Sequence, residues 1–332
     1  NYTMQIKDSF DRTIDYVRIG VTDRCNLRCF YCMPKEGIPY EPKADLLSYE
    51  EIIRLLDVLG NLGFRKVRFT GGEPFLRKNF ITLLEKTHQL AHFKNIHITT
   101  NGTLMTQHIT KLKELGINSL NLSLDTLDAD RFKKITRRDD FKKVIQTFHT
   151  LIDEGFKLKV NAVVMKGINT QDILPLVALA KQHPVSIRFI EEMPFNGGYK
   201  ENSTIFKATD IFKTIKKKHV SLSPKIGKHG DTSTNYSIDG FIGDVGIIPA
   251  FSRTFCDTCN RLRITPKGDI KTCLYDGGTY SIRDYIRSGV TNEQIASKFI
   301  ELIKLKPKDG FVAEQGSNQS IIREASMSSI GG

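Results

Sequence analysis

The sequence predicts an α/β fold, an incomplete (β/α)6 barrel of the TIM type with a carboxy-terminal extension. Six short β-rich runs alternate with helix-like segments between residues 16 and 192. Cysteines and unusual polar residues follow the ends of these runs, and in a barrel those ends share the face where active sites lie. The alternation stops near residue 200. A doubly wound sheet is the alternative, but the chain has neither a GxGxxG nor a P-loop motif.

Strand and helix signals follow one another in regular order. The runs that predict strands are 16–22, 66–70, 95–100, 119–124, 157–164 and 185–192. The first helix-like segment opens at Ser48, where Glu51 three residues later completes a capping-box pattern. The other segments cover 78–91, 105–116, 141–155 and 171–182. Strands that alternate with helices indicate βα units in a parallel sheet.

The pattern divides the chain into two regions. Residues 1–200 hold the six βα units and are predicted to form the barrel. Residues 201–332 begin with a basic helix over 205–219 and continue with a Gly/Ser/Asp-rich stretch, a second group of cysteines and a helical region over 281–304. A length of 332 residues suits about two domains.

Composition and charge narrow the class of protein. Hydrophobic residues make up 39% of the chain, which is enough for a sizeable core, and no apolar run approaches the ~20 residues that span a bilayer. The first residues lack a signal-peptide pattern, so we expect a soluble cytoplasmic protein without a membrane partner. The net charge of +12 invites a nucleic-acid interpretation. Because the lysines are spread along the chain, a polyphosphate ligand is favoured over nucleic acid.

Three of the six cysteines fall in the stretch "RCNLRCFYC" (24–32), as Cys25, Cys29 and Cys32. In a reducing compartment such a group points to metal binding or catalysis before disulfides. A structural zinc site needs a fourth ligand, and none is local. A [4Fe–4S] cluster held by three thiolates leaves one iron open for a substrate or cofactor. The polar flanks, which include Arg24 and Arg28, indicate a loop rather than buried packing.

The spacing CxxxCxxC, with an aromatic residue before the last cysteine, resembles the motif of the radical S-adenosylmethionine (SAM) enzymes. The resemblance implies that Cys25, Cys29 and Cys32 bind three irons of a [4Fe–4S] cluster. It also implies that the amine and carboxylate of SAM chelate the fourth iron. One electron from the cluster would then cleave SAM and generate a 5′-deoxyadenosyl radical.

The stretch "TGGEP" (70–74) after the second strand fits a SAM site. Its glycines allow backbone to approach a ligand closely, and Glu73 can accept a hydrogen bond from the methionine ammonium. The alternative interpretation of this stretch is a simple turn. For the methionine at 193, the alternative is that it only packs in the core. The residues that the resemblance places on SAM are Tyr31, Gly72, Glu73, Ser123 and Met193.

The second cysteine group, Cys256, Cys259 and Cys273, has the spacing CxxC-x13-C. A zinc ribbon would need a fourth ligand, for which His229 is the plausible remote donor. A second [4Fe–4S] cluster with one open iron is the sharper interpretation, and that iron could bind a substrate nitrogen or oxygen directly. Between the cysteines lies an Arg-x-Arg pair whose guanidinium groups match phosphate oxygens, unless it forms surface salt bridges.

From about Asp11 to Gly332, the two cysteine groups, the Arg-x-Arg pair and the Gly-Gly terminus closely resemble the GTP 3′,8-cyclases of molybdenum cofactor biosynthesis. In that family the second cluster binds the guanine of GTP, and basic residues in the barrel hold the triphosphate. The matching substrate-binding positions are Arg18, Arg68, Thr99, Lys159, Arg261 and Arg263.

Several of these cations lie inside β-runs, where a buried unpaired charge is costly. Helices cover the outside of a parallel barrel, so Arg68 and Lys159 are predicted to point into a central cavity that holds phosphates. Arg188 fits the same argument, and we expect it to act as a catalytic residue that supplies a hydrogen late in the reaction. The resemblance also implies that Gly331 and Gly332 reach into the barrel and take part in catalysis, although a frayed terminus is the common alternative.

The resemblance implies hydrogen removal from C3′ of GTP, attack of the sugar radical on C8 and reduction to (8S)-3′,8-cyclo-7,8-dihydro-GTP. It implies two [4Fe–4S] clusters and SAM as cofactors. The implied partners are GTP, an electron donor and, functionally, the cyclic pyranopterin monophosphate synthase, and a homodimer is left open.

One rival is a peptide-modifying radical SAM enzyme, which would need no ring of strand cations. The other is a basic zinc- or cluster-containing nucleic-acid binder, which would have no use for GGEP or six βα units.

Overall fold

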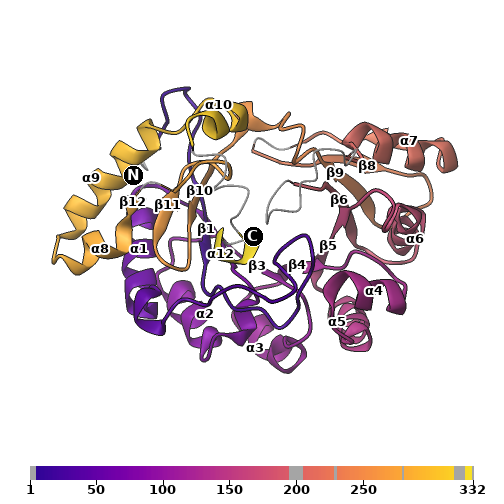
Figure 1. Cartoon of the computed structure of the whole chain (residues 1–332), viewed down its shortest axis with the longest axis horizontal. Helices are drawn as coiled ribbons and strands as arrows, with labels where there is room; N and C mark the ends of the chain where they lie inside the picture. The colour runs from indigo at the N-terminus through magenta and orange to yellow at the C-terminus, as the bar shows by residue number, and fades with distance from the viewer. Residues whose placement is uncertain (1–4, 194–204, 228–229, 279, 318–325, 331–332) are drawn as a thin grey trace.

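Six parallel strands in chain order form the centre of one curved sheet (Figure 1). The computed structural model describes residues 5–193, 205–227, 230–278, 280–317 and 326–330. The central strands are β1 (Tyr16–Gly20), β2 (Lys66–Thr70), β3 (Asn95–Thr100), β4 (Ser119–Ser123), β5 (Lys157–Val164) and β6 (Ser186–Glu191). All six predicted strands are confirmed, with ends that differ slightly from the predicted ones.

Two further parallel strands come from the region after residue 200. Strand β9 (Asp244–Ile248) pairs with β6, and β10 (Arg261–Ile264) pairs with β1. The parallel part of the sheet therefore has eight strands rather than the predicted six. Both added strands are short, and β10 carries two arginines, so neither has the long apolar run that marks a buried strand in sequence.

Antiparallel strands flank the two ends of the sheet. Strands β11 (Asp269–Lys271) and β12 (Tyr280–Ser281) follow β10, whereas β8 (Thr234–Ser237) and β7 (Ser223–Pro224) follow β9. Among the described residues no pairing joins the two ends, so the sheet does not close. This confirms the incomplete barrel. The division at residue 200 stays a prediction, since the sheet itself runs on across that point.

Helices pack on the outer side of the curved sheet (Figure 1). They are α1 (Tyr49–Asn61), α2 (Phe80–Gln89), α3 (Ile109–Glu114), α4 (Ala129–Thr136), α5 (Phe141–Asp153), α6 (Ile173–Gln182) and α7 (Ala208–Lys218). Short 3₁₀ turns cover Lys43–Asp45, Pro74–Leu76, Thr106–His108, Thr170–Asp172 and Cys256–Thr258. The predicted capping box at the start of α1 is confirmed, because Ser48 N donates to Glu51 Oε2 over 2.7 Å and Glu51 N donates to Ser48 Oγ over 3.1 Å. None of the helices in the described part of the chain is both long and apolar enough to span a membrane.

The alternation of side chains along β5 explains why charges face inward. Its apolar residues Leu158, Val160, Ala162 and Val164 are all buried and belong to the large core cluster that also includes residues of α5 and α6. Successive residues of a strand point to opposite faces of the sheet. Lys159 is therefore directed away from the helices and lines the cavity inside the barrel.

The remaining helices belong to the carboxy-terminal region. They are α8 (Ile282–Arg287), α9 (Asn292–Lys304), α10 (Gly310–Gln315) and α12 (Met327–Ile330). Helix α9 packs beside α1, where Arg54 donates to the Asn292 side chain over 2.8 Å. Helix α12 lies within the partial ring of strands, close to β1 (Figure 1). The end of the described chain is thus brought to the centre of the barrel.

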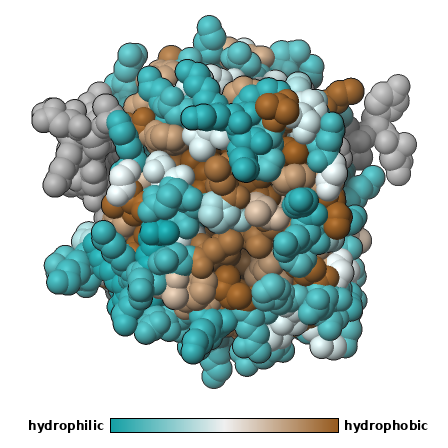
Figure 2. Space-filling view, turned by 90° about the vertical axis from the view of Figure 1, so that its right-hand side faces the viewer, coloured by the Kyte–Doolittle hydropathy of each residue, from teal (hydrophilic) through white to brown (hydrophobic). Residues whose placement is uncertain are grey.

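The surface on the right-hand side of Figure 1 is mostly polar around its edge, with apolar residues visible near the middle (Figure 2). Exposed apolar side chains include Val220, Ile226 and Ile242, which flank β7–β9. Apolar atoms make up more than half of the surface of an ordinary folded protein, so this exposure is unremarkable.

Candidate active site

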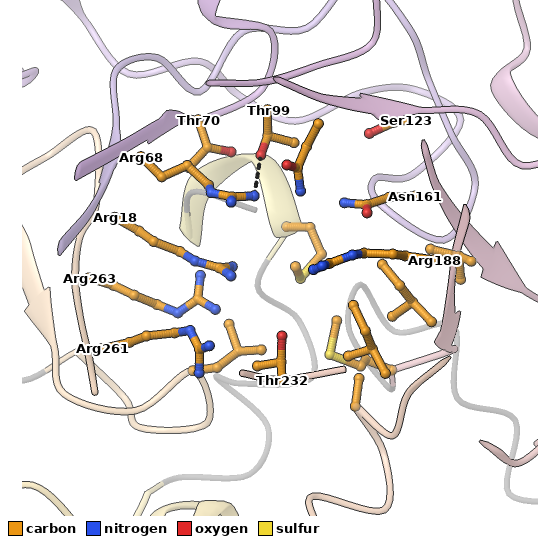
Figure 3. Close-up of a pocket in the computed structure, with 18 of the residues that line it drawn as sticks. Arg18, Arg68, Thr70, Thr99, Ser123, Asn161, Arg188, Thr232, Arg261 and Arg263 are labelled. Carbon is orange, nitrogen blue, oxygen red and sulfur yellow. Dashed lines mark hydrogen bonds between the residues drawn. The ribbon is translucent and has the colours of Figure 1, made fainter. Parts of the chain in front are cut away.

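A cavity of about 540 Å³ fills the inside of the barrel. Both cysteine groups line it, together with the inward-facing cations of the strands (Figure 3). It extends from the loop after β1 down to residues at the start of β2 and β3, such as Lys66 and Asn95. A single ligand in this cavity could therefore contact both cysteine groups and the cations.

The loop that follows β1 carries Cys25, Cys29 and Cys32. It turns at Cys29, whose carbonyl accepts from Cys32 N over 2.9 Å, and it is held to α4 because Arg28 N donates to Thr136 O over 2.8 Å. All three cysteines are free thiols. Burial raises the pKa of Cys25 to about 11 and that of Cys32 to about 12. Without a bound cation these thiols would stay protonated, and bound iron would change that.

The donor set fits a multi-iron cluster. Among the described residues, no three His, Cys, Asp or Glu side chains converge closely enough to hold one metal ion. The cysteines of each group nevertheless line the same cavity. A single zinc ion needs all its ligands around one position. A cluster binds each thiolate to a different iron, so thiols that line one wall but are spaced apart suit a cluster better. His229, the remote zinc donor considered from sequence, lies outside the described residues.

The glycines of "TGGEP" let two loops approach each other. Gly71 has φ +149°, and a Cβ on Gly72 would lie 2.1 Å from Arg24 O. Gly72 N donates to Thr22 O over 2.8 Å. The sequence predicted that these glycines let backbone approach a ligand. In the structure they bring the backbone of TGGEP close to the loop that carries the first cysteine group. Gly72 also lines the cavity.

Glu73 is fully buried behind the cavity wall. Its carboxylate accepts from Thr100 Oγ1 over 2.9 Å, Phe75 N over 3.2 Å and Asn101 N over 2.7 Å. Burial nevertheless raises the pKa of Glu73 to about 7. The stretch "TTNG" at the end of β3 therefore holds the glutamate in place. The predicted contact of Glu73 with SAM stays a prediction.

The other predicted SAM residues come together at the cavity. Tyr31, Ser123 and Met193 all line it. The Tyr31 hydroxyl donates to Asp125 Oδ2 over 2.7 Å, and Val163 N donates to Asp125 Oδ1 over 2.8 Å. Burial raises the pKa of Asp125 to about 6. Asp125, which stands two residues after the end of β4, is given no role in the sequence-based predictions.

All the predicted substrate-binding residues line the cavity. Arg18, Arg68, Arg261 and Arg263 point into it from one side, and Arg188 from the other (Figure 3). The cations on one side are adjacent in register, because Arg18 on β1 is paired with Arg68 on β2 and with Arg263 on β10. Thr99 accepts from Arg68 Nη1 over 3.3 Å.

These cations are crowded, and three of them have a buried nitrogen without a hydrogen-bond partner among the described residues. Burial, and then the neighbouring cations, lower the pKa of Lys159 to about 8 and that of Arg263 to about 9. The buried Nε atoms of Arg68, Arg188 and Arg261 have no hydrogen-bond partner among the described residues. Buried donors without acceptors are costly. An anion with several oxygens would relieve both the repulsion and the missing hydrogen bonds.

Sequence reasoning missed two residues of this group, Lys66 and Tyr16. Both line the cavity, and Lys66 Nζ lies 4.5 Å from the centre of the Tyr16 ring. The Tyr16 hydroxyl accepts from Arg18 Nε over 3.1 Å. Burial favours the neutral phenol, but the surrounding cations, Arg18 foremost, lower the pKa of Tyr16 to about 6. Strand alternation could have found both, since each stands two residues from a predicted site arginine.

The second cysteine group lies on the wall formed by β10 and β11. Cys256 opens a 3₁₀ turn, Cys259 precedes β10 and Cys273 follows β11. Burial would raise the pKa of Cys259, but Lys306 and then Arg261 lower it to about 6. Arg261 Nη1 also approaches Cys259 Sγ to 3.9 Å. This group is therefore set in more positive surroundings than the first.

The end of the described chain is held between the two cysteine groups. Ser326 Oγ donates to Cys32 O over 2.8 Å. Ile330 is buried in a small cluster with Tyr275 and Ala313, against which Cys273 and Met193 pack. The predicted catalytic residues Gly331 and Gly332 lie outside the described residues.

Comparison with known proteins identifies the family. The Radical SAM superfamily model matches residues 19–180, and the Molybdenum Cofactor Synthesis C model matches residues 185–312. GTP 3′,8-cyclase of Lactiplantibacillus plantarum is 38% identical over 333 residues, which is 99% of each chain. The mitochondrial GTP 3′,8-cyclase of Arabidopsis thaliana is 38% identical over 90% of this chain and 77% of its own.

Other relatives are longer. Molybdenum cofactor biosynthesis protein 1 of Drosophila melanogaster is 40% identical over 91% of this chain but only 54% of its own length, so this chain spans about half of it. Among solved structures, Streptococcus suis SuiB bound to S-adenosylmethionine has a TM-score of 0.57 at 18% identity, over 80% of this chain and 61% of that one. That likeness concerns the fold alone.

Family, donor set and cavity agree on the cofactors, which are SAM and two [4Fe–4S] clusters. That the two cysteine groups hold these clusters stays a prediction. Identity of 38% over the whole of a GTP 3′,8-cyclase is sufficient for family membership. The chain therefore belongs to the radical SAM superfamily and, within it, to the family of the GTP 3′,8-cyclases.

Proposed function

We propose that the chain is a GTP 3′,8-cyclase, which converts GTP to (8S)-3′,8-cyclo-7,8-dihydro-GTP in an early step of molybdenum cofactor biosynthesis. The observation that carries this proposal is that two three-cysteine groups and a set of strand cations line one cavity. GTP combines a base with lone pairs, suited to an open iron, and a triphosphate suited to buried cations.

The first cysteine group and its surroundings provide the radical-generating end. The cluster and SAM, when bound there, supply one-electron cleavage of SAM and hence a species that abstracts hydrogen. Tyr31, Gly72, Ser123 and Met193 line the adjoining wall and would position SAM. Glu73 is held by three donors and would orient the methionine ammonium from behind this wall.

The cations hold the triphosphate in this proposal. Arg18, Arg68 and Lys159 sit on strands, so their backbones are rigid before the ligand arrives. The free hydrogen-bonding capacity of Arg68, Arg188 and Arg261 supports an anionic ligand over a peptide. Guanine would lie at the second cysteine group, beside Arg261 and Arg263. A substrate held at both ends loses less entropy when its sugar meets its base.

Two further roles belong to this proposal. Arg188 faces the other cations across the cavity (Figure 3). It would supply the hydrogen late in the reaction as a proton, while the electron donor supplies the accompanying electron. Gly331 and Gly332 follow directly on Ile330, which is anchored among cavity residues, and we propose that they take part in catalysis. The enzyme would also need an electron donor, and its product would be consumed by the cyclic pyranopterin monophosphate synthase. We propose a cytoplasmic location, and a homodimer stays open.

The test is an anaerobic incubation with GTP, SAM and dithionite, followed by product identification by mass spectrometry and NMR. We expect 5′-deoxyadenosine and the 3′,8-cyclised nucleotide in similar amounts. Cys29→Ser should abolish both products, whereas Cys259→Ser should abolish only the cyclised one. Deleting Gly331 and Gly332 should stop cyclisation and leave both clusters in place. Formation of 5′-deoxyadenosine without any change to GTP would contradict the proposed substrate.

A further inference from the structure

A buried lysine lies beside the second cysteine group, just beyond the end of α9. Lys306 is 4% exposed, although it belongs to a surface region in which the lysines at 304 and 308 are exposed. Its Nζ donates to Arg261 O over 3.1 Å and to Thr272 O. Among the described residues it takes part in no ion pair with a carboxylate, unlike buried Arg12, which pairs with Asp8 over 2.6 Å.

The two carbonyls that Lys306 binds lie close in sequence to two of the cysteines. Arg261 stands two residues after Cys259, and Thr272 stands immediately before Cys273. One ammonium group thus ties the cysteine segment before β10 to the segment after β11. The third cysteine is tied in by Arg12, whose Nη1 donates to Cys256 O over 2.9 Å and to Lys308 O over 2.7 Å.

A buried ammonium group with only neutral acceptors is costly, so its charge calls for an anion nearby. The thiolates of the second cysteine group meet that need. Lys306 Nζ is hydrogen-bonded to the carbonyl of Thr272, the residue directly before Cys273, and to that of Arg261, two residues after Cys259. Its positive charge therefore lies beside two of the three proposed iron ligands.

We propose that Lys306 is a positioning residue for the second [4Fe–4S] cluster. It holds two cysteine segments at the cluster spacing, and its charge offsets the negative charge of the thiolate-ligated cluster. This inference rests on the second cluster of the proposed function, but not on the identity of the substrate.

The charge has a consequence for redox behaviour. Reduction adds one electron, and therefore one negative charge, to the cluster. A cation held close by in a low-dielectric interior stabilises the reduced form more than the oxidised form. Local charge and hydrogen bonds are the means by which proteins set the potentials of such clusters. Lys306 should therefore make the second cluster easier to reduce.

Three variants separate the two contributions of Lys306. Lys306→Met removes both the charge and the hydrogen bonds, Lys306→Gln keeps a donor without charge, and Lys306→Arg keeps both. The matched control is Lys304→Met, which removes an exposed lysine from the last turn of α9. The full-length protein is compared anaerobically, with and without replacement of Cys25, Cys29 and Cys32 by Ala, so that the signal of the second cluster is identified.

The readouts are the midpoint potential, from a dithionite titration followed by EPR, and the rate at which iron is lost to a chelator. We expect a more negative potential for Lys306→Met and Lys306→Gln, and a near wild-type potential for Lys306→Arg and Lys304→Met. Iron loss from the second site should be several-fold faster in Lys306→Met than in wild type. Lys306→Gln should lie between them.

A wild-type potential in Lys306→Gln would overturn the charge compensation, and wild-type iron retention in Lys306→Met would overturn the positioning role. If Lys306→Met does not fold, the comparison of Lys306→Gln with Lys306→Arg decides the question. None of these readouts uses GTP. A protein that shows the potential shift but does not cyclise GTP would contradict the proposed function alone, whereas a protein with only about four irons would contradict the second cluster on which both depend.

Discussion

Single residues show why an anionic ligand would suit the cavity. Arg68 is buried. Its Nη1 donates to Thr99 Oγ1 over 3.3 Å, while its Nε has no hydrogen-bond partner among the described residues. Lys66 stands two residues before Arg68 on the same strand and lines the same cavity. Neighbouring cations lower the pKa of Lys66 and of Arg68 in addition to the effect of burial, so holding these cations together costs free energy that a phosphate chain would offset.

The missed residue Lys66 gives the first prediction. Lys66→Met should weaken GTP binding by roughly 1.5–3 kcal/mol, the range for hydrogen bonds to charged groups, which is on the order of ten- to a hundredfold in Kd. Isothermal titration calorimetry under anaerobic conditions measures it. The control is Lys157→Met, which removes an exposed lysine at the start of β5 and should leave Kd unchanged. Equal affinities for GTP and guanosine in the wild type would refute a phosphate role for Lys66.

The lowered pKa of Lys159 gives the second prediction. In the free protein this pKa is about 8, below the usual 10.5, chiefly because of burial and then because of Arg188. GTP binds best when Lys159 is protonated, and the triphosphate should raise its pKa. Binding above about pH 8 must then take up a proton, so affinity should fall by up to about tenfold per pH unit. Affinity should be nearly constant just below that pH.

The control for this pH dependence is Lys159→Arg, because the guanidinium stays protonated throughout the range. Its Kd for GTP, measured at about pH 7, 8 and 9, should change less than that of the wild type. Parallel pH profiles of the two proteins would assign the titration to another group.

At the scale of elements, two loops and one short helix assemble the proposed radical-generating end of the cavity. The loop after β2 lies against the loop after β1, where Gly72 N donates to Thr22 O and Glu73 N donates to Arg24 O, each over 2.8 Å. Helix α12 closes on the same cysteine loop through Ser326 and Cys32. Three segments distant in sequence therefore determine the shape of one cysteine loop.

The contact between these loops gives the third prediction. Gly72→Ala should displace the first cysteine loop, because the new Cβ would lie 2.1 Å from Arg24 O and both are constrained by backbone. Iron content should fall from about eight to about four per chain as the first cluster is lost and the second remains. Gly227→Ala, where nothing lies within 4 Å, is the control and should retain all its iron. Full iron content and SAM cleavage in Gly72→Ala would show that the loop adapts.

At the scale of the whole molecule, the region after residue 200 completes the parallel sheet. It supplies β9 and β10, which pair with β6 and β1 on either side of the six predicted strands. It also supplies Val245 and Ile247, which are buried in the same core as the barrel helices. The predicted division at residue 200 thus separates two stretches of chain that share one sheet and one core.

This shared sheet gives the fourth prediction. A fragment of residues 1–200 should aggregate rather than fold, because β1 and β6 would each expose an unpaired edge. Size-exclusion chromatography and circular dichroism of the purified fragment measure this. Joint expression with residues 201–332 should increase the soluble yield. A soluble, cooperatively unfolding monomer of 1–200 would show that the division at residue 200 marks an independent domain.

The sequence by itself determined the six parallel strands, both cysteine groups and the inward direction of Arg68 and Lys159. Those conclusions rest on local spacing and on the twofold alternation of strands, which short stretches of chain express. Only the tertiary structure decided that β9 and β10 extend the parallel sheet, that Tyr16 and Lys66 join the cation cluster, and that Lys306 lies under the second cysteine group. Strand pairing and the burial of a lone lysine depend on contacts between segments far apart in the chain, and such contacts leave no periodic signal in the sequence around either partner.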